Sequence, residues 1–531
     1  MYTTSNPLIQ DSLSHLSGVS FLLAAIPVIL LVILLGILKL SGDKSALITL
    51  GATILLAIFA FDMPAEAAGL AFLYGVVKAI FPILIIIIMA IYSYNVLVHT
   101  HHMEIIKDQF SAISTDKSVQ VLLLTWGFGG LLEGMAGFGT AVAIPAAILI
   151  SLGFKPVFAA VVSLIANSVA TGFGAVGTPV KVLAVESGVG MENIQQLSQY
   201  VVLQLSPLMF IIPFIIAFMT NPTVKGLPKN ILLSLLIGVV SLVTQYFSAM
   251  YMGAETPAIM GSIASIIAII AFGKLTEKKK DGKEDTLPKY SSAQLLSAWS
   301  VYALILILVV LTSPLFPSLR ESLQSVCVMK IPFTIDSVQL DGSLLTVSKT
   351  QTITWLTDAG LLLFIGATVG GLLQGAKLSA LLKVLGKTII QQKKTIITVS
   401  CLIGLSSVMD FSGMIGVMGA ALALATGSLY PIFAPTIGCL GTFLTGSDTS
   451  SNILFGKLQS TVANQIGVDP TWLSAANTAG ATGGKIISPQ SIAVATSACG
   501  QQGKEGEIMK KALPFALLYI VVAGLVVYFF I

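Results

Sequence analysis

The sequence predicts an all-α polytopic membrane protein with about 12 membrane segments in two structural repeats, each with a re-entrant hairpin and a broken helix. Three observations lead to this fold class. Hydrophobic residues fill 55% and charged residues 10% of the 531 positions, whereas soluble domains carry roughly 25% charged residues. Apolar runs of about 20 residues, the length of a membrane helix, recur along the chain. Two further apolar regions are interrupted by glycines and polar residues in the same order.

The uninterrupted apolar runs have the length of ordinary membrane spans. They lie at about 20–40, 44–61, 66–98, 199–219, 229–249, 255–272, 292–312, 352–374 and 511–531. Residues 1–19 form a polar N-terminal tail, and the absence of lysine from its first 18 residues distinguishes it from a signal peptide. We expect the first transmembrane repeat at 20–220, linking spans and a Lys-rich cytoplasmic loop at 221–291, and the second repeat at 292–531.

Charged loops predict which side of the membrane each connection faces. The loop at 274–289 contains six lysines, and the amphipathic stretch at 377–394 contains five lysines and no acid. Both should be cytoplasmic, because cytoplasmic loops carry an excess of Lys and Arg. The polar loop at 313–351 balances its charges and has an Asp341-Gly342 turn between β-rich runs. We therefore expect it outside the cell, folded as a small β-hairpin.

The two interrupted regions lie at 119–189 and 396–466. Each has an acidic residue inside a glycine-rich break, Glu133 in the first and Asp410 in the second, and then a second break that begins Thr-Gly. A third interrupted stretch spans 474–495. In hydrocarbon, irregular backbone is tolerated only where protein buries it or where it lines a water-filled cavity. Paired broken segments therefore predict the central binding site of a secondary transporter.

Hydroxyl and proline residues in these breaks predict an anion site. Thr178-Pro179 and Ser488-Pro489 each place a capping hydroxyl before a proline at the first helical position. Helix N-termini of this kind favour anions, and the chain has no arginine except Arg320 in the polar loop. The candidate substrate-binding residues are break glycines, cap hydroxyls, amides and nearby lysines: Gly137, Phe138, Gly139, Asn167, Thr171, Gly172, Thr178, Lys181, Ser412, Ser447, Ser450, Ser451, Asn452, Lys457, Lys485, Ser488 and Gln490.

Carboxyl groups at membrane depth are costly and commonly mark a proton or ion route. Glu133 and Asp410 are the leading candidates for proton coupling, and Asp448 is the third. Other interpretations stay open at this point. Either leading acid could cap a hairpin tip, Asp448 could pair with Lys457 or Lys181, and the breaks could contain only caps and packing glycines.

Several classes of function have no support in the sequence. The net charge of +4 is small and confined to loops, so no nucleic-acid partner is expected. Residues 172–177 match GxGxxG but follow no strand, which argues against a dinucleotide site. The four cysteines are scattered and His99, His101 and His102 lie at the end of a span, so neither metal nor cofactor is predicted. Without a Walker motif, a Ser/His/Asp set or HExxH, an enzyme is not expected.

Four tracts resemble the bacterial L-lactate permease family: LLEGMAGFGTAVAIPAAILISLGF, GAVGTPVK, FLTGSDTSSN and ANTAGATGGKIISPQSIAVA. The resemblance covers nearly the whole chain. It implies a plasma-membrane symporter that takes up L-lactate, often also D-lactate and glycolate, together with a proton. It also implies a relation to ion transporters built from two inverted repeats. It does not identify the residues that contact substrate.

Two questions stay open from sequence alone. Six spans separate the two Lys-bearing amphipathic segments, which gives the repeats the same orientation, whereas inversion requires an odd number. The function also has alternatives, namely a di- or tricarboxylate symporter of related architecture and a passive anion channel. The expected partners are the hydroxycarboxylate, a proton and the lipid bilayer, with the oligomeric state open between monomer and homodimer.

Overall fold

The computed structural model describes residues 18–531 except 39, 112–113, 115, 138 and 277–289. Within these residues, ten helices are long and apolar enough to cross a membrane. The number becomes eleven if two helices at 156–187, which meet at a 50° bend, count as one broken span. The all-α membrane fold is therefore confirmed. The N-terminal tail and most of the Lys-rich loop lie outside the described residues.

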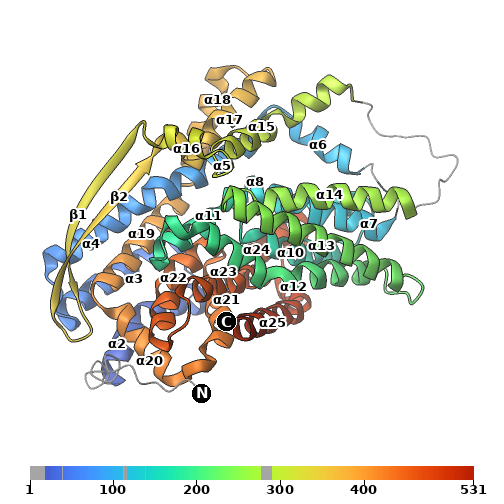
Figure 1. Ribbon diagram of the computed structural model, residues 1–531. Coiled ribbons are helices and arrows are strands. Elements are labelled where there is room, and N and C mark those ends of the chain that lie inside the picture. The colour runs from blue at the N-terminus through green and yellow to red at the C-terminus, as the bar shows by residue number, and fades with distance from the viewer. Residues whose placement is uncertain (1–17, 39, 112–113, 115, 138, 277–289) are drawn as a thin grey trace, which may run out of the picture.

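The first half of the chain begins with long apolar helices, continues through the helices that contain the first breaks, and ends with three long helices at 194–276 (Figure 1). Its elements are α2 (Gly18–Val32), η1 (Ile33–Ile37), α3 (Gly42–Ala60), α4 (Ala65–Lys78), η2 (Ala79–Leu84), α5 (Ile85–His99), α6 (His102–Ser111), α7 (Lys117–Leu122), η3 (Leu123–Phe128), α8 (Gly129–Met135), α9 (Thr140–Ser151), α10 (Pro156–Thr171), α11 (Gly174–Ser187), η4 (Met191–Asn193), α12 (Ile194–Thr220), α13 (Leu227–Met252) and α14 (Pro257–Thr276).

The second half contains the only sheet among the described residues. Its elements are α15 (Ser292–Leu311), α16 (Pro317–Gln324), β1 (Val328–Val338), β2 (Leu344–Thr354), η5 (Trp355–Thr357), α17 (Ala359–Leu373), α18 (Leu378–Gln391), α19 (Lys393–Phe411), α20 (Met414–Thr426), η6 (Gly427–Leu429), α21 (Tyr430–Thr445), α22 (Asp448–Ile466), α23 (Pro470–Lys485), α24 (Pro489–Ala498) and α25 (Glu505–Phe529).

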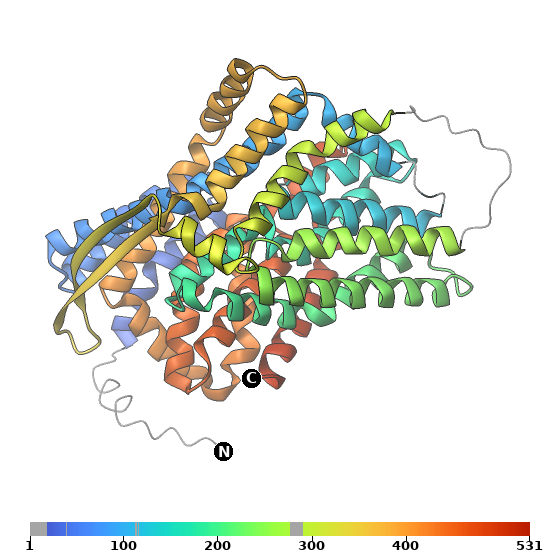
Figure 2. The same cartoon turned by 45° about the horizontal axis from the view of Figure 1, so that its top comes forward.

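The expected β-hairpin in the polar loop is confirmed. β1 and β2 pair antiparallel from Val328↔Thr354 to Val338↔Leu344. The turn uses Gly342 at φ +80°, a conformation that glycine adopts without strain. The Phe333 ring of β1 packs edge-on against Tyr74 of α4, with ring centroids 5.2 Å apart. The hairpin thus lies alongside α4 and α19 at one end of the molecule, opposite the start of α7 (Figures 1 and 2).

Helix α13 shows that the two helical hairpins, α7–α9 and α21–α22, enter the molecule from opposite ends. Its 26 residues span about 39 Å at 1.5 Å per residue. Near its start, Lys229 forms an ion pair of 2.7 Å with Asp116, at the base of the hairpin made by α7, α8 and α9. Near its other end, the Met250 carbonyl accepts a bond from Gln195 in the first turn of α12. Trp472, which follows α22 in the chain, packs its ring against Tyr200 of α12. The base of the second helical hairpin therefore lies at this other end of α13.

The structure corrects the position of the second hairpin. Instead of a re-entrant arm with Asp410 in its tip, α19 is one continuous helix of membrane-spanning length that packs along α3. The re-entrant pair is α21 and α22, which run antiparallel. Ser451 Oγ donates to the Gly438 carbonyl (2.7 Å), and Tyr430 OH donates to Gln459 Oε1 (3.0 Å). Their tip lies at residues 446–447, so Asp448 and not Asp410 is the acid at this tip.

The contacts of α13 bear on the question of orientation, because they place the bases of the two helical hairpins at opposite ends of that helix. Each hairpin is followed by a broken helix, α10–α11 or α23–α24. Three pairs of positions in these broken helices match at a constant separation of 310 residues: Asn167 and Asn477, Thr178 and Ser488, and Pro179 and Pro489.

Candidate functional site

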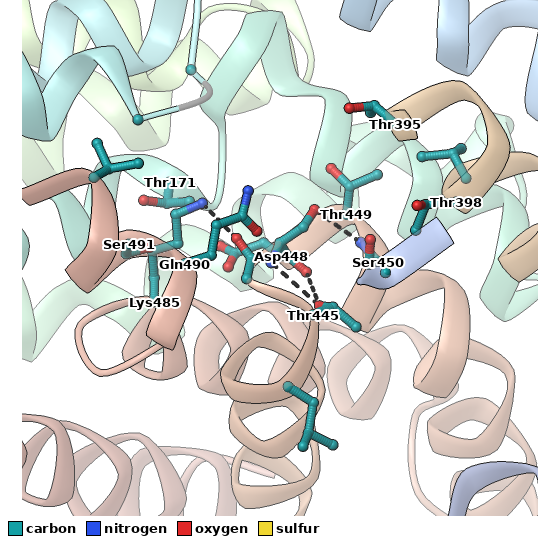
Figure 3. A pocket seen from close by; sticks show the side chains of 18 of the residues that line it. Thr171, Thr395, Thr398, Thr445, Asp448, Thr449, Ser450, Lys485, Gln490 and Ser491 are labelled. Carbon is teal, nitrogen blue, oxygen red and sulfur yellow. Dashed lines mark hydrogen bonds between the residues drawn. The ribbon is translucent and has the colours of Figure 1, made fainter. Parts of the chain in front are cut away.

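Four chain breaks converge on one cavity of about 880 Å³. They are the tip of the first hairpin at 136–139, the α10–α11 break, the tip of the second hairpin at 446–447, and the α23–α24 break. Ten of the candidate residues line this cavity: Glu133, Gly137, Gly139, Thr171, Thr178, Ser447, Asp448, Ser450, Lys485 and Gln490. Figure 3 shows that Lys485, Gln490 and Asp448 lie close together although they come from three elements.

Two of the breaks present helix N-termini to the cavity. Ser447 caps α22 by accepting a bond from the Ser450 amide (3.3 Å), and Ser488 caps α24 by accepting one from the Ser491 amide (3.2 Å). Pro489 occupies the first helical position, where a missing N–H costs nothing. The capping hydroxyls are therefore in use, and the free amides and positive ends of both helices remain for an anion.

The α10–α11 break has a different local cause. Ala175, Val176 and Gly177 all have positive φ, which stops the helix for one turn before Thr178. A Cβ at Gly177 would overlap the Ala254 carbonyl, so this turn can pack against the α13–α14 connection only with glycine. Thr178 does not cap α11 as the sequence suggested, because its Oγ1 donates to the Ala175 carbonyl (2.6 Å).

Two buried acids and one lysine lie in the interior of the cavity, whereas Asp43 and Lys394 line its mouth. Glu133 and Asp448 are 3% and 2% exposed. Lys485 acts electrostatically on both carboxyls, and its Nζ donates to the Gly446 carbonyl (3.0 Å). Asp448 Oδ1 accepts a bond from Thr442 (3.2 Å). Asp448 Oδ2 and Glu133 Oε2 have no hydrogen-bond partner among the described residues, and such buried oxygens are suited to gain a proton or a ligand contact.

A glycine holds the first acid in place. A Cβ at Gly174 would lie 2.7 Å from Glu133 Oε1, closer than real Cβ contacts. A Cβ at this position would therefore displace the Glu133 carboxyl from its place at the α10–α11 break. This approach joins the first hairpin to the first broken helix at the centre of the molecule.

Three charged candidates lie outside the cavity lining. Asp410 and Lys457 form a long ion pair with each other (3.9 Å), and Lys181 pairs with Glu255 (2.7 Å). Asp448 therefore pairs with neither lysine.

Other candidates have structural contacts instead. Gly172 packs against α23, and Ser412 Oγ donates to the Met409 carbonyl (3.2 Å). Ser451 bonds within its hairpin. Phe138 is outside the described residues.

A buried amide network surrounds the cavity without lining it. Asn452 Nδ2 donates to the Pro179 carbonyl (3.0 Å) and to Thr478 Oγ1 (2.8 Å), and Asn477 donates to Asn452 Oδ1 (2.9 Å). Asn167 Nδ2 donates to Thr171 Oγ1 (3.2 Å). These amides join α11, α22 and α23, and therefore fix the positions of the breaks relative to one another.

Sequence reasoning missed the mouth of the cavity. Ser41 and Asp43, before and within the first turn of α3, line it together with Gln392, Thr395 and Thr398 at the start of α19. Thr395 and Thr398 lie across the cavity from Lys485 (Figure 3). Polar residues at the start of a span are typical of ordinary helix ends, so their type alone does not predict a binding site. The helical spacing of Thr395 and Thr398 was the signal in the sequence that could have indicated this polar face.

No group of three or more His, Cys, Asp or Glu side chains that could hold a metal ion occurs among the residues that the structure describes. The two cavity acids share their site with Lys485, so a cation would compete with an existing positive charge.

Known proteins are similar to this chain over most of its length. The chain is 37% identical to an L-lactate permease of Streptococcus iniae, over 86% of this chain and 93% of that protein. It is 35% identical to the glycolate permease GlcA of Escherichia coli, over 96% and 95% of the two chains. Among solved structures, Neisseria gonorrhoeae MtrF gives a TM-score of 0.49 at 12% identity, covering 93% of this chain and 95% of that chain. The family model for L-lactate permeases matches residues 20–531. The chain belongs to the L-lactate permease family.

Proposed function

We propose that this multi-pass protein of the bacterial plasma membrane takes up L-lactate and similar 2-hydroxy monocarboxylates, D-lactate and glycolate among them, together with a proton. The names of the related permeases support the substrate class. The composition of the cavity supports the coupling of lactate to a proton, because Glu133, Asp448 and Lys485 meet there at four chain breaks.

A count of charges supports one proton per substrate anion. Lys485 supplies one positive charge, and the N-termini of α22 and α24 together supply about one more, at roughly +0.5 each. Two carboxylates and a bound monocarboxylate anion supply three negative charges. One negative charge remains beside carboxyls that are 3% and 2% exposed, where it is costly. A single proton on one carboxyl removes it.

Helix ends support Glu133 as the group that takes this proton. Asp448 is the first residue of α22, where a helix favours a negative charge. Glu133 lies in the last turn of α8, where a helix favours a positive charge and disfavours a carboxylate. Asp448 also accepts a hydrogen bond from Thr442. We therefore assign the transported proton to Glu133, and a permanent negative charge beside Lys485 to Asp448.

The substrate carboxylate then has two suitable partners. The first-turn amides of α22 and α24 face the cavity, and Lys485 lies between these helix starts. Gln490 and Thr449 supply side chains that could bond the 2-hydroxyl, because both line the same cavity. With both acids charged, the empty site has no excess positive charge to attract an anion, so the proton binds before or together with the substrate.

The position of the mouth supports an inward-facing state. The mouth lies beside Lys393 and Lys394, whose Lys-rich surroundings are expected on the cytoplasmic side. The β-hairpin lies at the other end of α19, beside Gly413. In this orientation residues 20–220 and 292–531 form the two inverted repeats, and residues 221–291 link them. The oligomeric state, monomer or homodimer, stays a prediction without a test in these contacts.

Reconstituted liposomes test the proposal. An inward proton gradient should drive accumulation of labelled L-lactate, and unlabelled D-lactate and glycolate should compete. Accumulation that responds to sodium but not to pH would contradict proton coupling. A large lactate current that reverses at the equilibrium potential of the anion would instead support a passive channel.

A further inference from the structure

Three ion pairs surround α11 and α22 at the end of the cavity away from its mouth. Glu186 of α11 pairs with Lys78 at the end of α4 (2.9 Å). Lys181 of α11 pairs with Glu255 in the α13–α14 connection (2.7 Å). Lys457 of α22 faces Asp410 at the end of α19 (3.9 Å).

The contacts between α11 and α22 themselves are of another kind. Ser460 Oγ donates to the Ser187 carbonyl (2.6 Å), and Asn452 donates to the Pro179 carbonyl (3.0 Å). Among the described residues, every ion pair of these two helices leads instead to α4, α19 or the α13–α14 connection, none of which contains a break at the cavity. The three ion pairs therefore all lie on one boundary, which separates the helices α11 and α22 from the elements around them.

This boundary lies beyond the binding cavity. Glu186 is eight residues past Thr178, which lines the cavity, and eight helical residues cover about 12 Å. On α19, Asp410 is 15 residues past Thr395 of the mouth, or about 22 Å. Lys181 is only three residues past Thr178, so its pair with Glu255 lies nearest the cavity, and the other two pairs lie further from the mouth.

Stability alone does not account for charges at this boundary. The Lys78 and Glu186 side chains are 8% and 2% exposed, and a buried ion pair is often no more stable than apolar residues of the same volume. Charged side chains at membrane depth commonly belong to a transport path. An apolar boundary would resist the entry of water, whereas separated Lys and Glu side chains are readily hydrated.

We propose that these three ion pairs are the closed outer gate of the transporter, and that Lys78, Lys181 and Lys457 line the anion's path when the pairs separate. The inference rests on the proposed transport function, because it assumes that the cavity must open to both sides. Two neighbours belong to the same charged group. The Tyr74 ring lies 5.1 Å from Lys78 Nζ, and Asp358 at the start of α17 interacts with both Lys181 and Glu255.

The experiment compares two versions of the most buried pair. The apolar double variant Lys78→Met with Glu186→Leu keeps the volume and favours the closed boundary. The exchanged double variant Lys78→Glu with Glu186→Lys keeps the ion pair in the closed gate. Its charged side chains can still be hydrated when the gate opens. The matched control is Lys511→Met with Glu507→Leu, which removes an exposed pair on α25.

Opening is read from a reporter at the boundary. Val182, buried in the closed structure beside Lys181, is changed to cysteine in a Cys327→Ser background, because Cys327 is exposed. Cells are treated from outside with a membrane-impermeant maleimide, and uptake of labelled lactate is measured in parallel. The parent without Val182→Cys gives the background labelling.

If the three ion pairs form the gate, external labelling and lactate uptake should each fall at least tenfold in the apolar variant. In the exchanged and control variants both should stay within about threefold of the protein with its native pairs. Normal labelling and uptake in the apolar variant would overturn the proposal, as would no external labelling of the Val182→Cys protein with its native pairs. If the apolar variant does not reach the membrane folded, Lys181→Met with Glu255→Leu replaces it under the same criteria. Labelling does not require lactate to be the substrate, so a gate that opens without any lactate uptake would contradict the proposed function and not the gate.

Discussion

Replacing Glu133 by glutamine should separate lactate transport from the proton gradient. Glutamine has nearly the volume of the protonated acid, and it gives the cavity permanently the charge that we assign to the proton-loaded state. Lactate binding should therefore persist, and exchange of internal for external lactate should stay within about threefold. Net movement of lactate would then carry one negative charge, because no proton accompanies it.

The size of the effect follows from the charge count of the cavity. With one proton per anion, a gradient of one pH unit supplies about 1.4 kcal/mol and should concentrate lactate about tenfold at zero membrane potential. The Glu133→Gln protein should show no such accumulation. It should respond instead to membrane potential, at about 2.3 kcal/mol per 100 mV, so an inside-positive potential of about 60 mV should concentrate lactate about tenfold.

Proteoliposomes with a potassium ionophore allow both driving forces to be set independently. The control is Glu507→Gln, which removes an exposed acid outside both the cavity lining and the proposed gate. A Glu133→Gln protein that still concentrates lactate about tenfold per pH unit would refute the assignment of the proton. An equal loss of exchange and accumulation would mean that Glu133 is needed for binding and not for coupling.

Three other predictions concern the same cavity. Lys485→Gln removes the counter-charge of two acids and should raise the KM for lactate uptake about 30- to 160-fold, since hydrogen bonds to charged groups contribute about 2 to 3 kcal/mol. An unchanged KM would place the substrate carboxylate elsewhere. Gly174→Ala should displace the Glu133 carboxyl and lower proton-driven uptake at least tenfold, whereas Gly51→Ala, which meets open space on α3, should have no effect; equal uptake in the two variants would contradict the close approach. Asp410→Asn should keep proton-driven accumulation of about tenfold per pH unit, and its loss would show that the cavity acids are not sufficient for coupling.

The sequence predicted the kind of structure because membrane helices leave a strong compositional signal. Long apolar runs, Lys-rich ends and the Asp341-Gly342 turn each depend on local residue types. The β-hairpin and the convergence of Glu133, Asp448 and Lys485 on one cavity follow the predicted pattern. Two charged residues that failed to join the cavity, Asp410 and Lys457, lie further along helices whose first turns do line it.

The register of the second repeat could not be read from apolar patterns. A continuous span such as α19 and a re-entrant arm have similar length and composition, and a glycine-rich turn follows either of them. What distinguishes them is the partner along their length, and α19 packs along α3 whereas α21 pairs with α22. The ion pair of Lys78 with Glu186 was likewise invisible, because its partners are 108 positions apart in the chain.

The two repeats have the same order of hairpin and broken helix but different charged residues at the cavity. This difference makes coupling to one proton physically reasonable. At the constant separation of 310 residues, Lys485 of the second broken helix corresponds to Ala175 of the first. The hairpin acids also differ, because Glu133 precedes its tip and ends a helix, whereas Asp448 follows its tip and begins one. If each repeat supplied its own acid with its own lysine, the cavity would carry two balanced pairs and a bound anion would need no proton. One lysine shared by two acids at opposite helix ends leaves a single excess negative charge, and places it on the carboxyl that its helix does not stabilise.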